Sequence, residues 1–136
     1  MTHPITLLQG ALVAALRADA GLTALVGANA IFDAPRDGRA GPYVVIARHD
    51  LVPRDGDAAP GYEHRVLLHL WHPDPSRKAV LAIADRVLAV ALAGSLAPAG
   101  LAVTNVSHDR TDTAIDLDMG SARAALTLRF FTEPSA

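Results

Sequence analysis

The sequence predicts an α+β fold, with a mainly antiparallel sheet of about four strands and helices packed on one face. Residues 62–71 and 122–131 alternate between apolar and polar side chains, with the period of two that half-buried strands show. Apolar residues recur instead at helical spacing in residues 5–16 and 79–92. Because the helical segments come before or between antiparallel pairs of strand segments, they indicate an α+β sheet with helices on one face.

The N-terminal region predicts a helix followed by a shorter one. Pro4 suits the first helical turn, where its missing N–H would be unpaired anyway. Gly21 weakens the first helix, which begins at Pro4, and Gly27 is expected to end the short second helix. The pair Ile31-Phe32 is expected to form a brief edge strand.

The middle of the chain predicts two long strands. Residues 43–51 begin as a nearly continuous apolar run and then alternate, so this strand should start covered on both faces and end half exposed. In residues 62–71 one face carries Val66, Leu68 and Leu70. The opposite face places Leu67 and Trp71 among polar groups, which is common where a sheet meets another subunit.

A third helix and two more strands complete the expected order. Asp74 is a good N-cap, Pro75 a good first helical residue, and Gly94 should stop the helix. Its polar strip is narrow, essentially Lys78, Asp85 and Arg86, so most of its circumference should be covered. An extended segment from residue 101 to 118 then leads through a turn at Met119-Gly120 into the last strand.

Composition limits the possible classes of function. A chain of 136 residues suits one domain, residues 1–136, and its 51% apolar and 19% charged residues are typical of a globular protein. The net charge of −2 argues against an extended nucleic-acid footprint, and the absence of cysteine excludes disulfides and thiolate sites. The beginning of the chain lacks a signal-peptide layout and residues 79–103 are interrupted by charges, proline and glycine, so we expect folding in the cytoplasm and no membrane partner.

The histidines and a carboxylate cluster are the candidates for chemistry. A metal site would need His49 or His69 to meet Asp50 or Asp74 across strands, and no metalloenzyme spacing supports one, so solvated or interface histidines are expected. Four carboxylates are spaced along the strand–turn–strand near the C-terminus: Asp109, Asp112, Asp116 and Asp118. We expect them to form a solvated face paired with Arg123 and Arg129 rather than an acid–base pair. No catalytic, cofactor-binding or metal residue is therefore predicted.

The polar segment at residues 53–61 has two interpretations that the residues leave open. It is either a long hairpin connection or an arm that orders when it docks on a partner.

Several blocks line up in one order over nearly the whole chain. These are residues 12–27 (LVAALRADAGLTALVG), 31–35 (IFDAP), 42–46 (PYVVI), 68–71 (LHLW) and the helix at 79–92. In this order the chain resembles the tail-terminator (tail-completion) family of long-tailed bacteriophages and gene transfer agents.

The resemblance implies a structural role with no enzymatic activity and no cofactor. Members of that family form a ring, typically of six subunits, that caps the head-proximal end of the tail tube and stops its polymerisation. The implied partners are other copies of the chain, the major tail tube protein and the head connector or stopper, with DNA passing through the lumen unbound. The particle would assemble in the bacterial cytoplasm and hold the protein at the head–tail junction.

Two sets of residues follow as candidates for this role. Subunit or tube contacts are expected at Arg54, Asp55, Asp57, Leu67, Trp71, Asp85 and Arg86. The lumen is expected at Asp109, Asp112, Asp116 and Asp118, since like charge keeps DNA from sticking. The alternatives are another neck component, a metal-dependent hydrolase using His49, His69 and carboxylates, or a ligand-binding α+β module outside any virus.

Overall fold

The computed structural model describes residues 2–34, 41–54 and 60–135. In these residues the order of elements is α1 (Pro4–Ala18), α2 (Ala20–Val26), β1 (Ile31–Phe32), β2 (Tyr43–Pro53), β3 (Tyr62–His72), α3 (Arg77–Leu92), β4 (Leu101–Asp116) and β5 (Ser121–Pro134). The strands form one sheet in the order β1-β2-β3-β5-β4. The α+β class is confirmed.

The sheet differs from the predicted one in strand number and direction. It contains five described strands rather than about four, because the two-residue β1 joins its edge. That strand pairs in parallel with Val44 and Val45 of β2, so the sheet is mixed, while the three remaining pairings are antiparallel. The predicted brief edge strand at Ile31-Phe32 is confirmed, although two residues give too short a run for any period to show.

Local capping chemistry sets the helix ends. Pro4 lies in the first turn of α1, and the Asp19 carboxylate accepts a hydrogen bond from the Leu22 N–H at the start of α2. Gly27 ends α2 with a φ of 98°, which glycine adopts readily. The third helix starts later than predicted: its N-cap is Ser76, whose hydroxyl accepts from the Ala79 N–H, and not Asp74. None of the described helices alone is long and apolar enough to cross a membrane, whereas α1 and α2, bent by 80° at their junction, satisfy the length and composition test as a pair.

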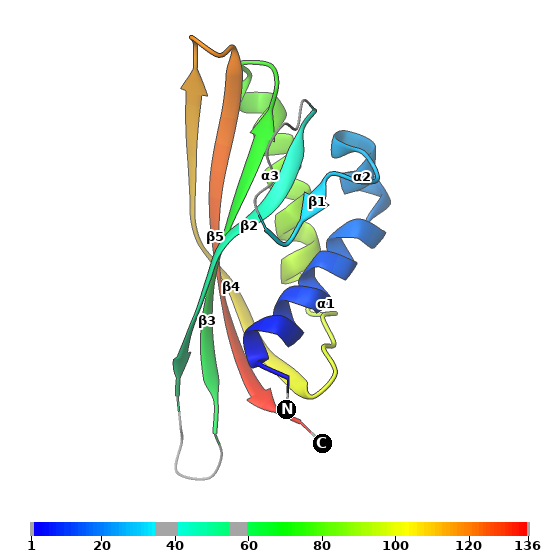
Figure 1. Cartoon of the computed structure of the whole chain (residues 1–136), viewed down its shortest axis with the longest axis vertical. Helices are drawn as coiled ribbons and strands as arrows, with labels where there is room; N and C mark the ends of the chain where they lie inside the picture. The colour runs from blue at the N-terminus through cyan, green and yellow to red at the C-terminus, as the bar shows by residue number, and fades with distance from the viewer. Residues whose placement is uncertain (1, 35–40, 55–59, 136) are drawn as a thin grey trace.

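All three helices lie on the same side of the sheet, whose strands twist strongly along their length (Figure 1). The buried cluster between the layers combines Leu8, Leu12 and Leu16 of α1 with residues of α3 and of the sheet. On β3 the predicted core face is confirmed, since Val66, Leu68 and Leu70 are fully buried. The turn between β4 and β5 extends beyond the helices at the top of the view (Figure 1). The opposite face of the sheet, called the outer face below, is left without a helix in the described part of the chain.

Candidate assembly surfaces

The outer face of the sheet carries charges arranged around a nearly buried carboxylate. Glu63 on β3 has only 11% of its side chain exposed, and three arginines lie around it: Arg54 at 3.1 Å, Arg129 at 3.8 Å and Arg65 at 3.9 Å. The Arg129 guanidinium also lies 3.5 Å from the Asp109 carboxylate. A carboxylate desolvated this far needs such compensation, so the network ties the β2, β3, β4 and β5 strands together on this face.

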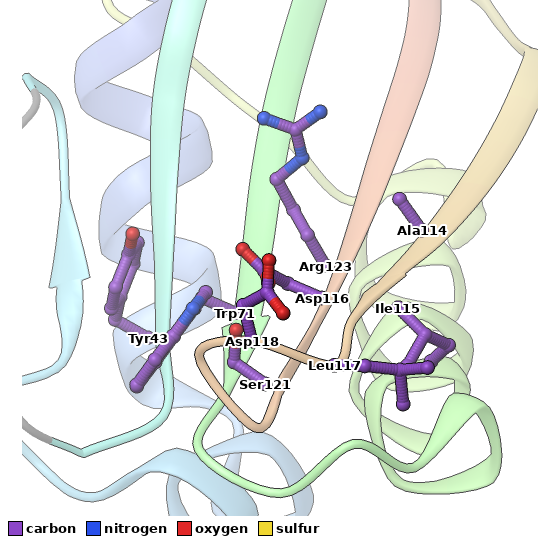
Figure 2. A pocket seen from close by; sticks show the side chains of 9 residues that line it. All are labelled: Tyr43, Trp71, Ala114, Ile115, Asp116, Leu117, Asp118, Ser121 and Arg123. Carbon is purple, nitrogen blue, oxygen red and sulfur yellow. The ribbon is translucent and has the colours of Figure 1, made fainter.

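An aromatic pair and a hollow occupy the other end of the same face. The rings of Tyr43 and Trp71 stack with centroids 5.6 Å apart and planes at 17°. Beside them is a hollow of about 670 Å³, lined also by Arg123, Asp116 and Asp118 near the β4–β5 turn. Figure 2 shows both carboxylates next to Trp71, with the Arg123 guanidinium directed away from them. An open, mixed aromatic and charged hollow of this kind suits a protein contact better than a small ligand.

The predicted lumen carboxylates have different partners within the subunit. Asp109 pairs with Arg129, as expected, but Asp112 pairs with Arg110 of its own strand at 2.9 Å. Asp116 accepts a hydrogen bond from the Met119 N–H at 3.0 Å and so closes the turn. Around Asp109 and Asp112 the outer face therefore pairs carboxylates with arginines instead of presenting uncompensated negative charge. Whether these residues line a lumen stays a prediction.

The predicted contact residues lie at separate places. Arg54 is engaged by Glu63, and Leu67 and Trp71 are half-buried on the outer face. Asp55 and Asp57 lie outside the described residues, as does most of the polar segment at 53–61.

The α3 candidates face away from the sheet. Asp85 is exposed, whereas Arg86 donates two hydrogen bonds to the Asp19 carboxylate, at 2.8 and 3.1 Å. The hydrogen bond from Arg86 lowers the pKa of Asp19. Arg86 thus has a structural partner that fixes α3 to the junction of α1 and α2, and a Cβ on Gly21 would lie 2.8 Å from its Nε.

A buried histidine pair is the main feature that the sequence did not predict. His64 is fully buried, its Nδ1 lies 2.8 Å from His49 Nε2, and its Nε2 lies 2.9 Å from the Thr132 hydroxyl. Burial lowers the pKa of each imidazole to about 4. The expectation of solvated or interface histidines is therefore wrong for His64.

The proton positions in this pair follow from the buried His49 Nδ1, which has no partner among the described residues. An unpaired acceptor costs less than an unpaired N–H, so Nδ1 is the bare nitrogen. His49 Nε2–H then donates to His64 Nδ1, and His64 Nε2–H donates to Thr132. The two neutral imidazoles and the Thr132 hydroxyl form a series of hydrogen bonds that links β2, β3 and β5. Within the described ranges no three His, Cys, Asp or Glu residues are grouped so that they could hold a metal ion.

A change of parity along β2 was the signal for the pair. Val44 and Ile46 face the core, and the register of β2 on β3 shifts between Ile46 and Arg48. After this bulge the odd residues His49 and Leu51 turn to the core face. The change from a continuous apolar run at residues 43–47 to the alternation that follows is visible in the sequence, but which face His49 and Leu51 take depends on the bulge.

The β4–β5 turn exposes apolar side chains. Leu117 and Met119 are 82% and 76% exposed, the highest values among the large apolar residues of the described chain. Together the two residues form an exposed apolar tip on this turn.

The model of the tail completion protein gp17 family matches residues 10–133. The chain belongs to the tail completion protein gp17 family. This family is a structural one and not an enzyme family, so the expectation that the chain has no enzymatic activity is confirmed.

Two solved structures resemble this tail completion protein along almost its whole length. One is a chain of the virion of a native gene transfer agent particle, with 25% identity and a TM-score of 0.84, covering 97% of this chain and 99% of that one. The other is the gp17 protein of bacteriophage SPP1, with 22% identity and a TM-score of 0.62, covering 92% and 88%. The second likeness concerns the fold. No curated protein matches the chain.

Proposed function

We propose that this protein is the tail terminator of a phage or phage-like particle, acting at the head–tail junction. The observation that carries the proposal is the likeness to a chain of a gene transfer agent virion over 97% of this chain and 99% of that one. This match covers nearly the full length of both chains, which supports a role for the whole chain as one particle subunit, in line with the family match. Copies of the chain would form a ring, expected to be hexameric, that ends the tail tube and meets the head connector.

The shape of the subunit supports a role between two axial neighbours. The long strands extend past the helices, so the molecule has two ends along the strand direction (Figure 1). One end is the β4–β5 turn with the exposed Leu117 and Met119. The other end is the β2–β3 hairpin, with Arg54 held by Glu63 at its base. With the strands along the ring axis, one end would contact the tail tube and the other the connector.

The outer face of the sheet is our candidate for the lumen. Its carboxylates at 109 and 112 are matched by arginines at 129 and 110, so its field decays over short distances. Such a surface neither holds nor strongly repels a phosphate backbone, which suits DNA that must pass.

The test is tube capping. Purified protein is mixed with the major tail tube protein of the same particle during tube polymerisation, and tubes are imaged by negative-stain electron microscopy. We expect shorter tubes with a ring at one end. Tubes of unchanged length, with the protein absent from the sedimented tubes, would refute the proposal. Pull-down that retains the connector protein but not the tube protein would instead identify another neck component.

A matched pair of variants tests the axial contact. Leu117→Ser with Met119→Ser removes the apolar tip, and we expect loss of binding to either the tube or the connector with unchanged folding. Leu25→Ser is the control, because Leu25 is also an exposed apolar side chain, at 41%, but lies on α2. Equal behaviour of the two variants would contradict a role for the tip.

A further inference from the structure

The two borders of the sheet are complementary in direction. The β4 strand forms one border along all of its sixteen residues. At the other border β1 pairs only with Val44 and Val45. On that side the rest of β2 has no described strand beside it. Long unpaired borders are templates for pairing with another chain. We propose that the β2 border of each copy pairs with the β4 border of the next copy, a proposal that rests on the proposed ring.

Strand direction favours this pairing. The β2–β3, β3–β5 and β5–β4 pairings are all antiparallel, so β2 and β4 run in opposite directions. Rotation about an axis that is only slightly tilted from the strands leaves their direction nearly unchanged. The β4 strand of one copy therefore meets the β2 strand of the next in antiparallel orientation, and the alternation continues around the ring. Two different borders that meet head to tail are what a closed ring requires.

Charge sets the register of the two borders. Arg48 and Asp50 form an exposed ion pair within β2, and Arg110 and Asp112 form an exposed ion pair within β4, each at 2.9 Å. All four side chains are on the outer face, by their pairing with neighbouring strands. In both strands the arginine comes two residues before the aspartate, so antiparallel juxtaposition places Arg48 opposite Asp112 and Asp50 opposite Arg110. Both contacts are then between opposite charges.

This register also gives the stagger that closure needs. Within one sheet Arg48 is level with Arg110, through Leu67 of β3 and Thr127 of β5. A neighbour without displacement would therefore set Arg48 against Arg110. Moving it by two residues, about 7 Å along the strand, exchanges that repulsion for the Arg48–Asp112 contact. Closed sheets require a stagger of this kind because their strands tilt about the axis.

The experiment exchanges the charges within each strand. One variant carries Arg48→Asp with Asp50→Arg, a second carries Arg110→Asp with Asp112→Arg, and a third carries all four changes. Every variant keeps the net charge and the ion pair within each strand. The exchange on β4 faces only Thr127 and Ala125 of β5, whereas Asp50→Arg also sets a like charge opposite Arg65 of β3, so circular dichroism checks the fold of each variant. We expect the first two to weaken self-association by about tenfold or more, because like charges then face each other, and the third to restore it. Analytical ultracentrifugation and native mass spectrometry measure this.

Unchanged association of the one-strand variants, or failure of the fourfold variant to restore association, would overturn the proposal. Capping of tubes by the wild type with no effect of either exchange would leave the terminator function standing and refute border pairing alone. An association that follows the charges without any capping would support border pairing and refute the terminator function.

Engineered cysteines give a second, covalent readout. The chain has no cysteine, so Asp50→Cys combined with Arg110→Cys introduces the only two thiols. In one copy these positions are separated by β3 and β5, about 14 Å at ordinary strand spacing, which exceeds the reach of a disulfide. Oxidation should therefore yield a ladder of cross-linked multimers on a non-reducing gel, ending at the ring size. Each single-cysteine variant, the control, can give dimers at most. A double variant that stays monomeric or stops at dimers would contradict the pairing.

Discussion

Acidification should destabilise the protein through the His49–His64 pair. Burial is the main reason that the pKa of each imidazole lies at about 4 instead of 6.5. The folded chain therefore keeps both rings neutral down to about pH 4, whereas the unfolded chain binds protons below about pH 6.5. The contribution to stability is complete above the unfolded value and is lost as the pH falls from about 6.5 to about 4.

The magnitude follows from the two pKa values. For His64 alone, the free energy of unfolding should fall by about 2 kcal/mol between neutral pH and about pH 5. Two independent imidazoles would double the loss. Since His49 is only half-buried and the second proton would enter beside the first, solvent screening and coupling reduce its share. We therefore expect a loss of about 2 kcal/mol for the pair, to an order of magnitude.

Urea unfolding at about pH 7.5 and about pH 5, followed by fluorescence of Trp71, measures this loss. Trp71 is the single tryptophan of the chain. The variant His49→Leu with His64→Leu removes both titrating rings, and the difference between the two pH values should shrink by about 2 kcal/mol. The control His108→Gln replaces an exposed histidine on β4 and should behave as the wild type. The same pH difference in the double leucine variant as in the wild type would refute the reasoning.

Three further predictions concern stability. Phe130→Ala should lower the free energy of unfolding by about 3–5 kcal/mol in urea titration, because Phe130 is fully buried, and a loss below about 1 kcal/mol would contradict its place in the core. Gly61→Ala should lower the melting temperature, since the new Cβ would lie 2.8 Å from a backbone carbonyl oxygen across the hairpin, whereas Gly10→Ala in open space on α1 should not lower it. Asp19→Asn keeps a capping oxygen but removes the ion pair with Arg86, so it should lower stability in low salt and less in high salt; an equal effect at both would assign the loss to the cap.

The periodicity of apolar residues and the positions of glycine and proline predicted most of the helices and strands. The alternation in residues 62–71 predicted both the β3 strand and its buried face, and the structure confirms both at Val66, Leu68 and Leu70. Gly27 ends α2 as predicted. These features depend on neighbours within a few residues, which the sequence displays directly. The start of α3 was missed by two residues because Asp74, Pro75 and Ser76 all carry helix-start chemistry, and only tertiary packing selects among them.

The candidate surfaces were less predictable, because they depend on register. Asp109 pairs with Arg129 while Asp112 pairs with Arg110, and only the bulge between His108 and Arg110 decides which carboxylate meets which arginine. The burial of His64 likewise depends on strand pairing and on the bulge in β2. A bulge adds one residue and reverses the face of every residue after it, so a local ambiguity in the sequence becomes a global change of surface.

The same border charges that we assign to ring closure also explain how a subunit with long open borders avoids pairing with unrelated strands. Charged side chains on an edge strand discourage pairing with arbitrary strands, because a foreign partner leaves them opposite apolar groups or like charges. In this chain Arg48 and Asp50 compensate each other within β2 until the neighbour's β4 offers the opposite order. Replacing all four border charges by threonine would remove both the deterrent and the register. We expect such a variant to aggregate in light-scattering measurements instead of forming closed rings, whereas the fourfold exchange, which keeps every charge, should stay as soluble as the wild type. A soluble threonine variant that still forms closed rings would show that the charges neither prevent pairing with unrelated strands nor set the register of the ring.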